Sequence, residues 1–210
     1  CEIAKAEALS AFGSSEIILE KSIVEPRHIE IQIMADNFGN IISLGERDCS
    51  VQRRHQKIIE ESPSPVVDAQ LRTKMGEVAC RAGTVINYSG AGTIEFLLDK
   101  DKNFYFLEMN TRLQVEHPVT EMVTGLDLVE LQLNIADDQE LPLSQEQVQL
   151  CGHSLEVRLY AEDPWKNFLP STGKIEVWRK HKSPDTRYDD GIVEGQVISP
   201  FYDPMLAKVI

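Results

Sequence analysis

The apolar residues of this chain recur at two spacings, and the helical spacing occurs in three stretches. In residues 2–12 they recur every three or four positions, and Gly13 is a suitable helix stop. The same period over 69–86 follows Asp68, whose carboxylate can cap a helix. A third helix is predicted over 120–136.

An alternating pattern, typical of strands, is clearest in residues 28–35. Isoleucines face one way there, and polar side chains such as His28 and Glu30 face the other. The turn residues of 36–40 lead to a return strand, so 28–46 is predicted to be a hairpin. Further strands are predicted at 17–21, 93–98, 104–109, 153–160, 174–178 and 192–197.

A polar row runs through residues 108–116, Glu-Met-Asn-Thr-Arg-Leu-Gln-Val-Glu. Its long polar side chains occupy every second position and would share one face of an extended segment. A solvated strand face would alternate in the same way. This row, however, combines carboxylates, amides and a guanidinium after an apolar run at 104–107. We therefore interpret it as the floor of a site.

The segments 93–98 and 104–109 are predicted to form a hairpin in which Glu95 lies opposite Glu108. Ionised carboxylates about 5 Å apart repel by roughly 3 kcal/mol at an effective dielectric near 20. A divalent cation would remove this cost, and Asn110 could add an oxygen ligand. Such a ligand set suits Mg²⁺ or Mn²⁺. A register slip by one residue would instead separate the two glutamates.

Residues 46–57 are strongly basic within an acidic protein. They could form a solvated loop, but clustered Arg, His and Lys side chains favour a local anion site. The formal charge of −13 argues against a nucleic-acid or anionic-membrane surface, and no stretch has the length of a transmembrane helix. Four widely spaced cysteines argue against a zinc site and favour a reducing compartment.

Several motifs together resemble the biotin carboxylase family of ATP-grasp enzymes, over essentially the whole chain. They are Arg53-Arg-His-Gln-Lys57, Gly90-Ala-Gly-Thr93, the run from Glu108 to Glu121, and Ala161-Glu-Asp-Pro164. The segments 141–146 and 183–187 are most similar to the biotin-containing subunit of 3-methylcrotonyl-CoA carboxylases.

The resemblance implies an α+β fold, the central and C-terminal portion of an ATP-grasp unit with antiparallel sheet flanked by helices. Residues 1–21 would end the lid subdomain, 22–148 would form the catalytic core, and 149–210 would begin the biotin carboxylase C-terminal domain. The acidic connection at 137–149 is the predicted boundary.

The implied reaction is the carboxylation of biotin by bicarbonate, driven by ATP through carboxyphosphate. ATP, Mg²⁺ or Mn²⁺, bicarbonate and carrier-bound biotin would be required. The implied partners are a biotin carboxyl carrier domain and a carboxyltransferase subunit, in an oligomer without nucleic acid or membrane. A bacterial cytoplasm and a mitochondrial matrix are both compatible with the sequence.

The resemblance also implies a role for each matching residue. Nucleotide contacts would come from Glu20, Lys21, Ile23, His28, Gln52 and His55. The metal would be held by Glu95, Glu108 and Asn110. Lys57 would pair with the γ-phosphate or bicarbonate, and Arg158 would reach the phosphate or biotin.

Bicarbonate handling is implied for the second half of the polar row. Arg112, Gln114 and the backbone of Val115 would bind the anion, and Glu116 would be the base that deprotonates it. Arg112 would also stabilise the biotin enolate. An arginine fork suits planar bicarbonate better than lysine does.

Simpler interpretations exist for single residues. His28 could be an ordinary strand residue, Lys57 a solvated loop cation, and Arg158 a surface partner of Glu156 or Glu162. The ordered set of motifs favours the functional interpretation.

The family pattern also has a glycine-rich phosphate loop upstream and a biotin-bearing lysine far downstream. Neither occurs in these 210 residues, so we expect a part of a longer protein that lacks full activity alone. The alternatives are a pyruvate or urea carboxylase, or a non-catalytic piece that mediates subunit contact.

Overall fold

Helices and strands follow one another along residues 1–210, all of which the computed structural model describes. The helices are α1 (Glu2–Phe12), α2 (Ala69–Val85), α3 (His117–Thr124) and α4 (Leu128–Ala136), with short 3-10 helices η1 (Gln145–Gln147) and η2 (Pro164–Lys166). The first strands are β1 (Arg27–Ala35), β2 (Ile41–Arg53), β3 (Gln56–Ser62), β4 (Gly90–Leu98), β5 (Phe104–Asn110) and β6 (Ser154–Tyr160). The remaining strands are β7 (Glu162–Asp163), β8 (Leu169–Pro170), β9 (Gly173–Lys174), β10 (Tyr188–Asp190), β11 (Val197–Ile198) and β12 (Met205–Val209).

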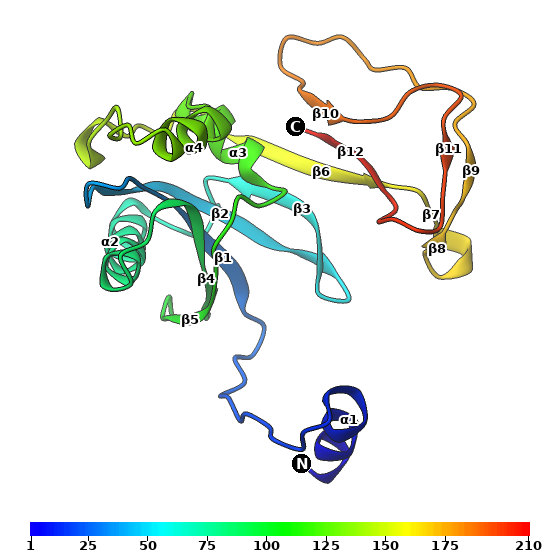
Figure 1. The fold of residues 1–210 in the computed structure, drawn as a ribbon, viewed down its shortest axis with the longest axis horizontal. Coiled ribbons are helices and arrows are strands. Elements are labelled where there is room, and N and C mark those ends of the chain that lie inside the picture. The colour runs from blue at the N-terminus through cyan, green and yellow to red at the C-terminus, as the bar shows by residue number, and fades with distance from the viewer.

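One antiparallel sheet of eight strands organises the molecule, in the order β10-β12-β6-β3-β2-β1-β4-β5. In Figure 1, α2 lies on one side of this sheet, and α3 and α4 lie on the other. Helix α1 stands apart from the sheet, and none of its residues is buried. The α+β class with antiparallel sheet and flanking helices is confirmed.

Two apolar cores cover the two faces of the sheet. The first joins β1 and β4 to α2 through Ile29, Ile31, Ile33, Ile94, Phe96, Leu98, Val67, Leu71, Met75 and Ala79. The second joins the other face to α4 through Met34, Ile42, Leu44, Ala91, Leu128, Leu131 and Ile135. Because side chains alternate along a strand, the polar residues His28, Glu30 and Gln32 of β1 are directed away from the first core. They lie on the face that α3 and α4 cover in part.

Several local predictions are confirmed. Helix α1 covers residues 2–12 and ends at Gly13, which has a φ of 73°. The hairpin of β1 and β2 forms around the predicted turn. Helix α2 begins after Asp68, whose side chain accepts a hydrogen bond of 2.9 Å from the amide of Leu71.

Three local predictions are wrong. Residues 17–21 form no strand, and Ile18 and Leu19 are exposed, because no neighbouring strand pairs with them. The helix predicted over 120–136 is two helices, since Gly125 adopts a φ of 72° and Asp127 caps α4. The strands predicted at 174–178 and 192–197 shrink to β9 and β11, each two residues long.

The C-terminal part contributes strands to the same sheet. Strand β6 pairs with β3, and β12 pairs with β6. Strands β10 and β12 were not predicted. No helix combines the length and the apolar character that crossing a membrane requires.

Candidate functional site

A cleft of about 690 Å³ opens on the polar face of the sheet. Its lining includes His28 of β1, Gln52 of β2, Glu95 of β4 and the whole polar row from β5 onward. Every predicted site residue except Glu20, Lys21 and Ile23 lines it. A larger hollow of about 870 Å³ lies between β10, β11 and β12 and contains none of the predicted residues.

The polar row is only partly a strand. Strand β5 ends at Asn110, and the residues that follow form a loop that leads into α3. The prediction of one extended segment is therefore wrong. Its consequence holds nevertheless, because Glu108, Asn110, Arg112, Gln114 and Glu116 all line the cleft.

The predicted pairing of the two glutamates is confirmed. Glu95 and Glu108 are direct partners in the register of β4 and β5. The register shifts between Glu95 and Phe96, so a bulge that was not predicted lies next to the pair. The turn between the strands is held by Asp99, which accepts hydrogen bonds of 2.9 Å from the amides of Asp101 and Asn103.

This pair fits a divalent cation by its chemistry. Glu108 is exposed to the cleft, whereas Glu95 is 3% exposed. Asn110 directs Nδ2 at both carboxylates, 3.0 Å from Glu95 Oε1 and 3.4 Å from Glu108 Oε1. Rotation of the amide would present Oδ1 in its place, which gives two carboxylates and a neutral oxygen, the ligands that Mg²⁺ and Mn²⁺ prefer.

Lys57 joins three carboxylates at the centre of the cleft. Its Nζ lies 2.5 Å from Glu30 Oε2, 2.6 Å from Glu116 Oε1 and 2.9 Å from Glu95 Oε1. Burial opposes its charge, but the surrounding carboxylates outweigh burial and raise the pKa of Lys57 above its usual value. Lys57 is therefore a partly buried, ion-paired cation and not a solvated loop residue.

The neighbours of Glu95 lower its pKa, whereas those of Lys57 raise the pKa of the ammonium. Burial raises the pKa of Glu95, but the hydrogen bond with His28 and the charge of Lys57 lower the pKa to about 2. Glu95 is thus held ionised at neutral pH, which is the state in which a carboxylate binds a cation.

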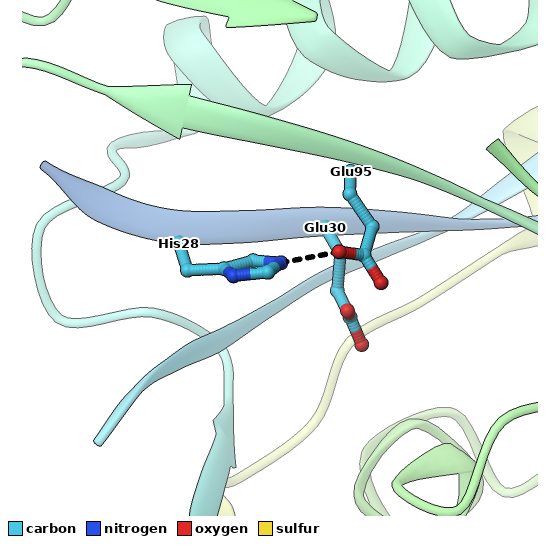
Figure 2. Close-up of side chains that lie close together, drawn as sticks. All are labelled: His28, Glu30 and Glu95. Atoms are coloured by element: carbon cyan, nitrogen blue, oxygen red, sulfur yellow. Dashed lines mark hydrogen bonds and ion pairs between the residues drawn. The ribbon is translucent and has the colours of Figure 1, made fainter. Parts of the chain in front are cut away.

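His28 is positioned by two side chains. Its Nε2 lies 2.6 Å from Glu95 Oε2, and its Nδ1 lies 3.0 Å from Gln52 Nε2. Since the amide of Gln52 donates to Nδ1, the Nε2 atom carries the proton that Glu95 accepts. Figure 2 shows the imidazole directed at Glu95, with Glu30 close beside that carboxylate.

His28, Glu30 and Glu95 each offer one ligand atom within 4.8 Å of one another. Both oxygens of Glu30 are already engaged, however, by Arg47 and Lys57. Glu108, by contrast, is exposed to the cleft and accepts only from Asn110, so the Glu95–Glu108 pair keeps a carboxylate available for a cation.

Glu116 lies between two cations. Its Oε1 accepts from Lys57, and its Oε2 accepts from Arg158 Nη2 at 2.8 Å. It directly precedes α3 and is 2% exposed. Arg158 also donates to Glu60 from Nε at 2.7 Å. The interpretation of Arg158 as a surface partner of Glu156 or Glu162 is therefore wrong.

The other two polar side chains of the row, Arg112 and Gln114, differ in exposure and in hydrogen bonding. Arg112 is exposed, and its guanidinium contacts only the carbonyl of Leu113 and Asn110 Oδ1, at 3.2 and 3.4 Å. Gln114 is 6% exposed and donates from Nε2 to Glu95 Oε1 at 2.8 Å. Arg112 is thus the cation of the row that is free to meet an anion.

Sequence reasoning missed a buried layer beneath the cleft. Arg47 is fully buried and donates to Glu30, Gln32, Thr93, Gln114 and Thr120. Lys208 of β12 donates from Nζ to the carbonyl of Val115 at 2.6 Å. The alternation of β1 signalled Glu30, but nothing local distinguished Arg47 from its basic neighbours.

Only part of the basic stretch faces the cleft, and the predicted anion site stays a prediction. His55 and Lys57 line the cleft. Arg53 instead pairs with Glu162 at 2.5 Å, and Arg54 donates to Asn167 at 2.8 Å. The cations of this stretch are thus divided between the cleft and contacts with the C-terminal part.

The predicted adenine-binding segment lies outside the cleft. Glu20 and Lys21 are exposed, and Ile23 is half-buried. Lys21 Nζ lies 5.1 Å from the ring centroid of Tyr105. These residues belong to the stretch between α1 and β1, which contains no regular element.

Two family models match the chain. Residues 1–144 match the carbamoyl-phosphate synthase L chain, ATP binding domain, and residues 156–210 match the biotin carboxylase C-terminal domain. The mitochondrial methylcrotonoyl-CoA carboxylase subunit alpha of Dictyostelium discoideum is 53% identical over 210 residues, which are 100% of this chain and 30% of that protein. Biotin carboxylase of a Nostoc species is 54% identical over 207 residues, which are 99% of this chain and 46% of that protein.

Solved structures agree with these sequence matches. The biotin carboxylase domain dimer of Hydrogenobacter thermophilus 2-oxoglutarate carboxylase, in complex with MgADP, ADP and bicarbonate, superposes with a TM-score of 0.94. It is 47% identical and covers 99% of this chain and 46% of that one. The biotin carboxylase–β-γ-ATP complex of Campylobacter jejuni gives a TM-score of 0.93 at 49% identity, with coverage of 99% and 46%.

The chain spans between about a third and a half of the length of these relatives. Along this chain the ATP-binding model matches first and the biotin carboxylase C-terminal model follows. The chain therefore belongs to the biotin carboxylase family, as an ATP-binding segment of the carbamoyl-phosphate synthase type followed by biotin carboxylase C-terminal sequence.

Proposed function

We propose that the protein carrying this chain is a ligase that carboxylates biotin with bicarbonate, at the expense of ATP and through carboxyphosphate. The observation that carries the proposal is the position of Glu116, between Lys57 and Arg158 and on the same cleft as the opposed pair Glu95 and Glu108. A base, two cations and a metal-binding pair are the groups that this reaction needs in one place.

Glu95, Glu108 and Asn110 would hold Mg²⁺ or Mn²⁺, which would supply charge neutralisation for the phosphates of ATP. Lys57 would then exchange part of its carboxylate contacts for the γ-phosphate or bicarbonate. The H. thermophilus relative was solved with MgADP and bicarbonate, which supports Mg²⁺ as the metal.

His28, Gln52 and His55 would contact the ribose and phosphates of the nucleotide. All three line the cleft, and Gln52 hydrogen-bonds to His28, which supports this assignment. Glu20, Lys21 and Ile23 would meet the adenine if the stretch before β1 folds over the cleft.

Bicarbonate would be bound by the free guanidinium of Arg112, by Gln114 and by the backbone of Val115. Glu116 would take its proton, and Arg158 would hold Glu116 and meet the phosphate or biotin. Arg112 would stabilise the enolate form of biotin after the proton is lost. The exposure of Arg112 and the burial of Glu116 support this division.

Carrier-bound biotin, a carboxyltransferase subunit and an oligomeric state belong to the same proposal. Similarity to methylcrotonoyl-CoA carboxylase alpha subunits favours an acyl-CoA as the final acceptor. Pyruvate is the second candidate, because the biotin carboxylase subunit of a pyruvate carboxylase superposes with a TM-score of 0.89. A mitochondrial matrix or a bacterial cytoplasm would suit these relatives.

The division into functional units is also a proposal. Residues 1–21 would belong to a lid, 22–148 to the ATP-grasp core and 149–210 to the C-terminal domain. The family models, which end at residue 144 and resume at 156, support a boundary in this region.

The test is Glu116→Gln in the full-length protein. The amide keeps the shape but cannot accept the bicarbonate proton, so we expect biotin-dependent ATP cleavage to fall by about 100-fold or more. Binding of Mg-ATP, measured by calorimetry, should be retained.

Glu130→Gln, an exposed change on α4, is the matched control and should leave both measurements unchanged. Biotin-dependent cleavage at the wild-type rate in Glu116→Gln would contradict the role of Glu116 as the base.

A further inference from the structure

Two buried carboxyl groups lie side by side beneath the cleft, outside the set assigned above. Glu60 on β3 and Glu156 on β6 are direct partners in the strand register, and both are 0% exposed. Opposite residues of an antiparallel pair place their Cβ atoms about 5 Å apart on the same face. Arg158 lies two residues beyond Glu156 and therefore shares that face.

The pair lacks the partners that two ionised carboxylates need. Only Glu60 Oε1 is engaged, by Arg158 Nε at 2.7 Å. The second oxygen of Glu60 and both oxygens of Glu156 have no hydrogen-bond partner. An unpaired buried charge is costly, and a proton shared between neighbouring carboxyl groups removes one charge and adds one donor.

The surrounding charges do not supply a second cation at bonding distance. The charged groups that act on the pair are Arg158 on β6, Lys208 on β12, Glu116 at the start of α3 and Glu30 on β1, and Tyr160 on β6 lies beside Arg158. Lys208 is committed to the carbonyl of Val115 and to Asp189. Arg158 is divided between Glu60 and Glu116.

The surroundings of the two carboxyl groups also favour their protonated forms. Burial raises the pKa of Glu156 to about 8 and that of Glu60 to about 7, although Lys208 and Arg158 act in the opposite direction. Because the groups are neighbours, the two steps belong to the pair and not to either residue alone.

We propose that Glu60 and Glu156 hold one proton between them at neutral pH and together position Arg158 toward Glu116. In this state the pair carries one negative charge, which Arg158 balances while its Nη2 remains on Glu116. This inference deepens the proposed function and rests on it, because Arg158 and Glu116 belong to the proposed bicarbonate site.

Loss of the shared proton in alkaline solution adds a negative charge beside Arg158. The guanidinium is then drawn toward the pair, and the potential at the cleft becomes less favourable for an anion. Bicarbonate binding should therefore weaken as the pH rises through about 8, where the pair loses its remaining proton.

The test compares Glu156→Gln with the wild type in the full-length enzyme, by the KM for bicarbonate from about pH 6.5 to 9. In the wild type we expect KM to rise by about three- to tenfold over this range. This is the change in anion affinity expected from one added negative charge near a partly solvated site. In Glu156→Gln the amide can donate to Glu60 in place of the shared proton, and with Arg158 it favours the ionised form of Glu60. The charge near Arg158 then changes little over this range, so KM should rise much less than in the wild type. An equal rise in both proteins would overturn the proposal.

Two further variants separate positioning from folding. Glu61→Gln is the matched control, since Glu61 neighbours Glu60 but pairs with His153 at 3.0 Å on the other side of β3. It should keep the wild-type pH profile. Glu60→Gln removes the charged acceptor of Arg158, so kcat should fall by about tenfold while the KM for ATP is unchanged. A kcat equal to the wild type in Glu60→Gln would overturn the positioning role.

A spectroscopic measurement makes the result independent of activity. Infrared spectra of the wild type should contain a protonated carboxyl band at pH 7 that disappears by about pH 9 and is reduced in Glu156→Gln. If this band is present but the enzyme shows no biotin-dependent ATP cleavage, the proposed function fails and the proton-sharing pair stands. If the band is absent at pH 7, the pair fails regardless of activity.

Discussion

At the scale of single residues, carboxylates outnumber the cationic side chains that pair with them in and beneath the cleft. Lys57, Arg47 and Arg158 face the carboxylates of Glu30, Glu60, Glu95 and Glu116. Glu108 adds a further negative charge without a cation at its side. The excess negative charge gathers on the Glu95–Glu108 pair, which is where a divalent metal would be most strongly attracted.

Lys57→Met tests the importance of this balance. Methionine fills a similar volume but leaves three carboxylates without their shared ammonium. Removing one partner of a buried ion pair costs about 3–5 kcal/mol, so we expect the free energy of unfolding at pH 7 to fall by that amount. Urea denaturation provides the measurement.

Lys74→Met is the matched control for this experiment. Lys74 is exposed on α2 and lies 5.4 Å from the ring centroid of Phe104. Its loss should cost no more than about 1 kcal/mol. A loss in Lys57→Met no larger than in Lys74→Met would show that the carboxylates do not depend on the ammonium.

Much of the cleft lining could be predicted from single residues. The buried carboxyl groups beneath it could not. Glu95, Glu108 and Glu116 have residue types and spacings that by themselves point to metal and proton chemistry. Glu60 and Glu156 lie far apart in sequence, and no strand was predicted at Glu60. Their meeting depends on the register of β3 against β6, which no local pattern determines.

At the scale of elements, α3 and α4 show that a glycine with positive φ can end a helix although the helical spacing of apolar residues continues. The helical stripe continues through residues 120–136, yet the chain breaks at Gly125. Glycine enters the left-handed region at no steric cost, and the side chain of Asp127 restarts the helix by accepting from the amide of Glu130 at 2.8 Å. This break allows α3 to begin beside Glu116 while α4 covers the second core.

Gly125→Ala tests the requirement for a positive φ. A Cβ at this position would meet no atom within 4 Å, so backbone strain is the only expected cost. We predict a loss of about 1 kcal/mol in the free energy of unfolding, measured by urea denaturation.

Gly191→Ala is the matched control, because its added Cβ is equally free and its φ lies outside the positive region. It should change stability by less than about 0.5 kcal/mol. If Gly125→Ala behaves in the same way as Gly191→Ala, the break between α3 and α4 does not depend on glycine.

At the scale of the whole molecule, one sheet joins the two segments that the family models separate. Strand β6 pairs with β3 through four register positions from Ile59–Val157 to Ser62–Ser154. The cleft depends on this junction, since Arg158 lines it and Lys208 holds the carbonyl of Val115, both from the C-terminal part. We therefore expect the sheet to unfold as one cooperative unit.

Two spectroscopic probes can test this expectation, because they report on different segments. Both tryptophans, Trp165 and Trp178, lie in the C-terminal part, whereas all four α-helices precede residue 137. In urea, tryptophan fluorescence and far-ultraviolet circular dichroism should share one midpoint. Separate midpoints would indicate that the segments unfold independently.

The sequence alone determined the elements and chemistry that depend on near neighbours. The period of α2, the alternation of β1, and the opposition of Glu95 and Glu108 all follow from residues a few positions apart or joined by one tight turn. The family motifs then identified the row from Glu108 to Glu116 as a site.

Only the tertiary structure decided what depends on contacts between distant strands. It brought Lys208 to the carbonyl of Val115, buried Arg47 beneath the cleft, and placed Glu60 against Glu156 with three of their four carboxyl oxygens lacking a hydrogen-bond partner. It also showed that the row leaves the strand at Asn110 yet still lines one cleft. Burial and long-range register set the charge state of these groups, because desolvation and neighbouring charges act through space and not along the chain.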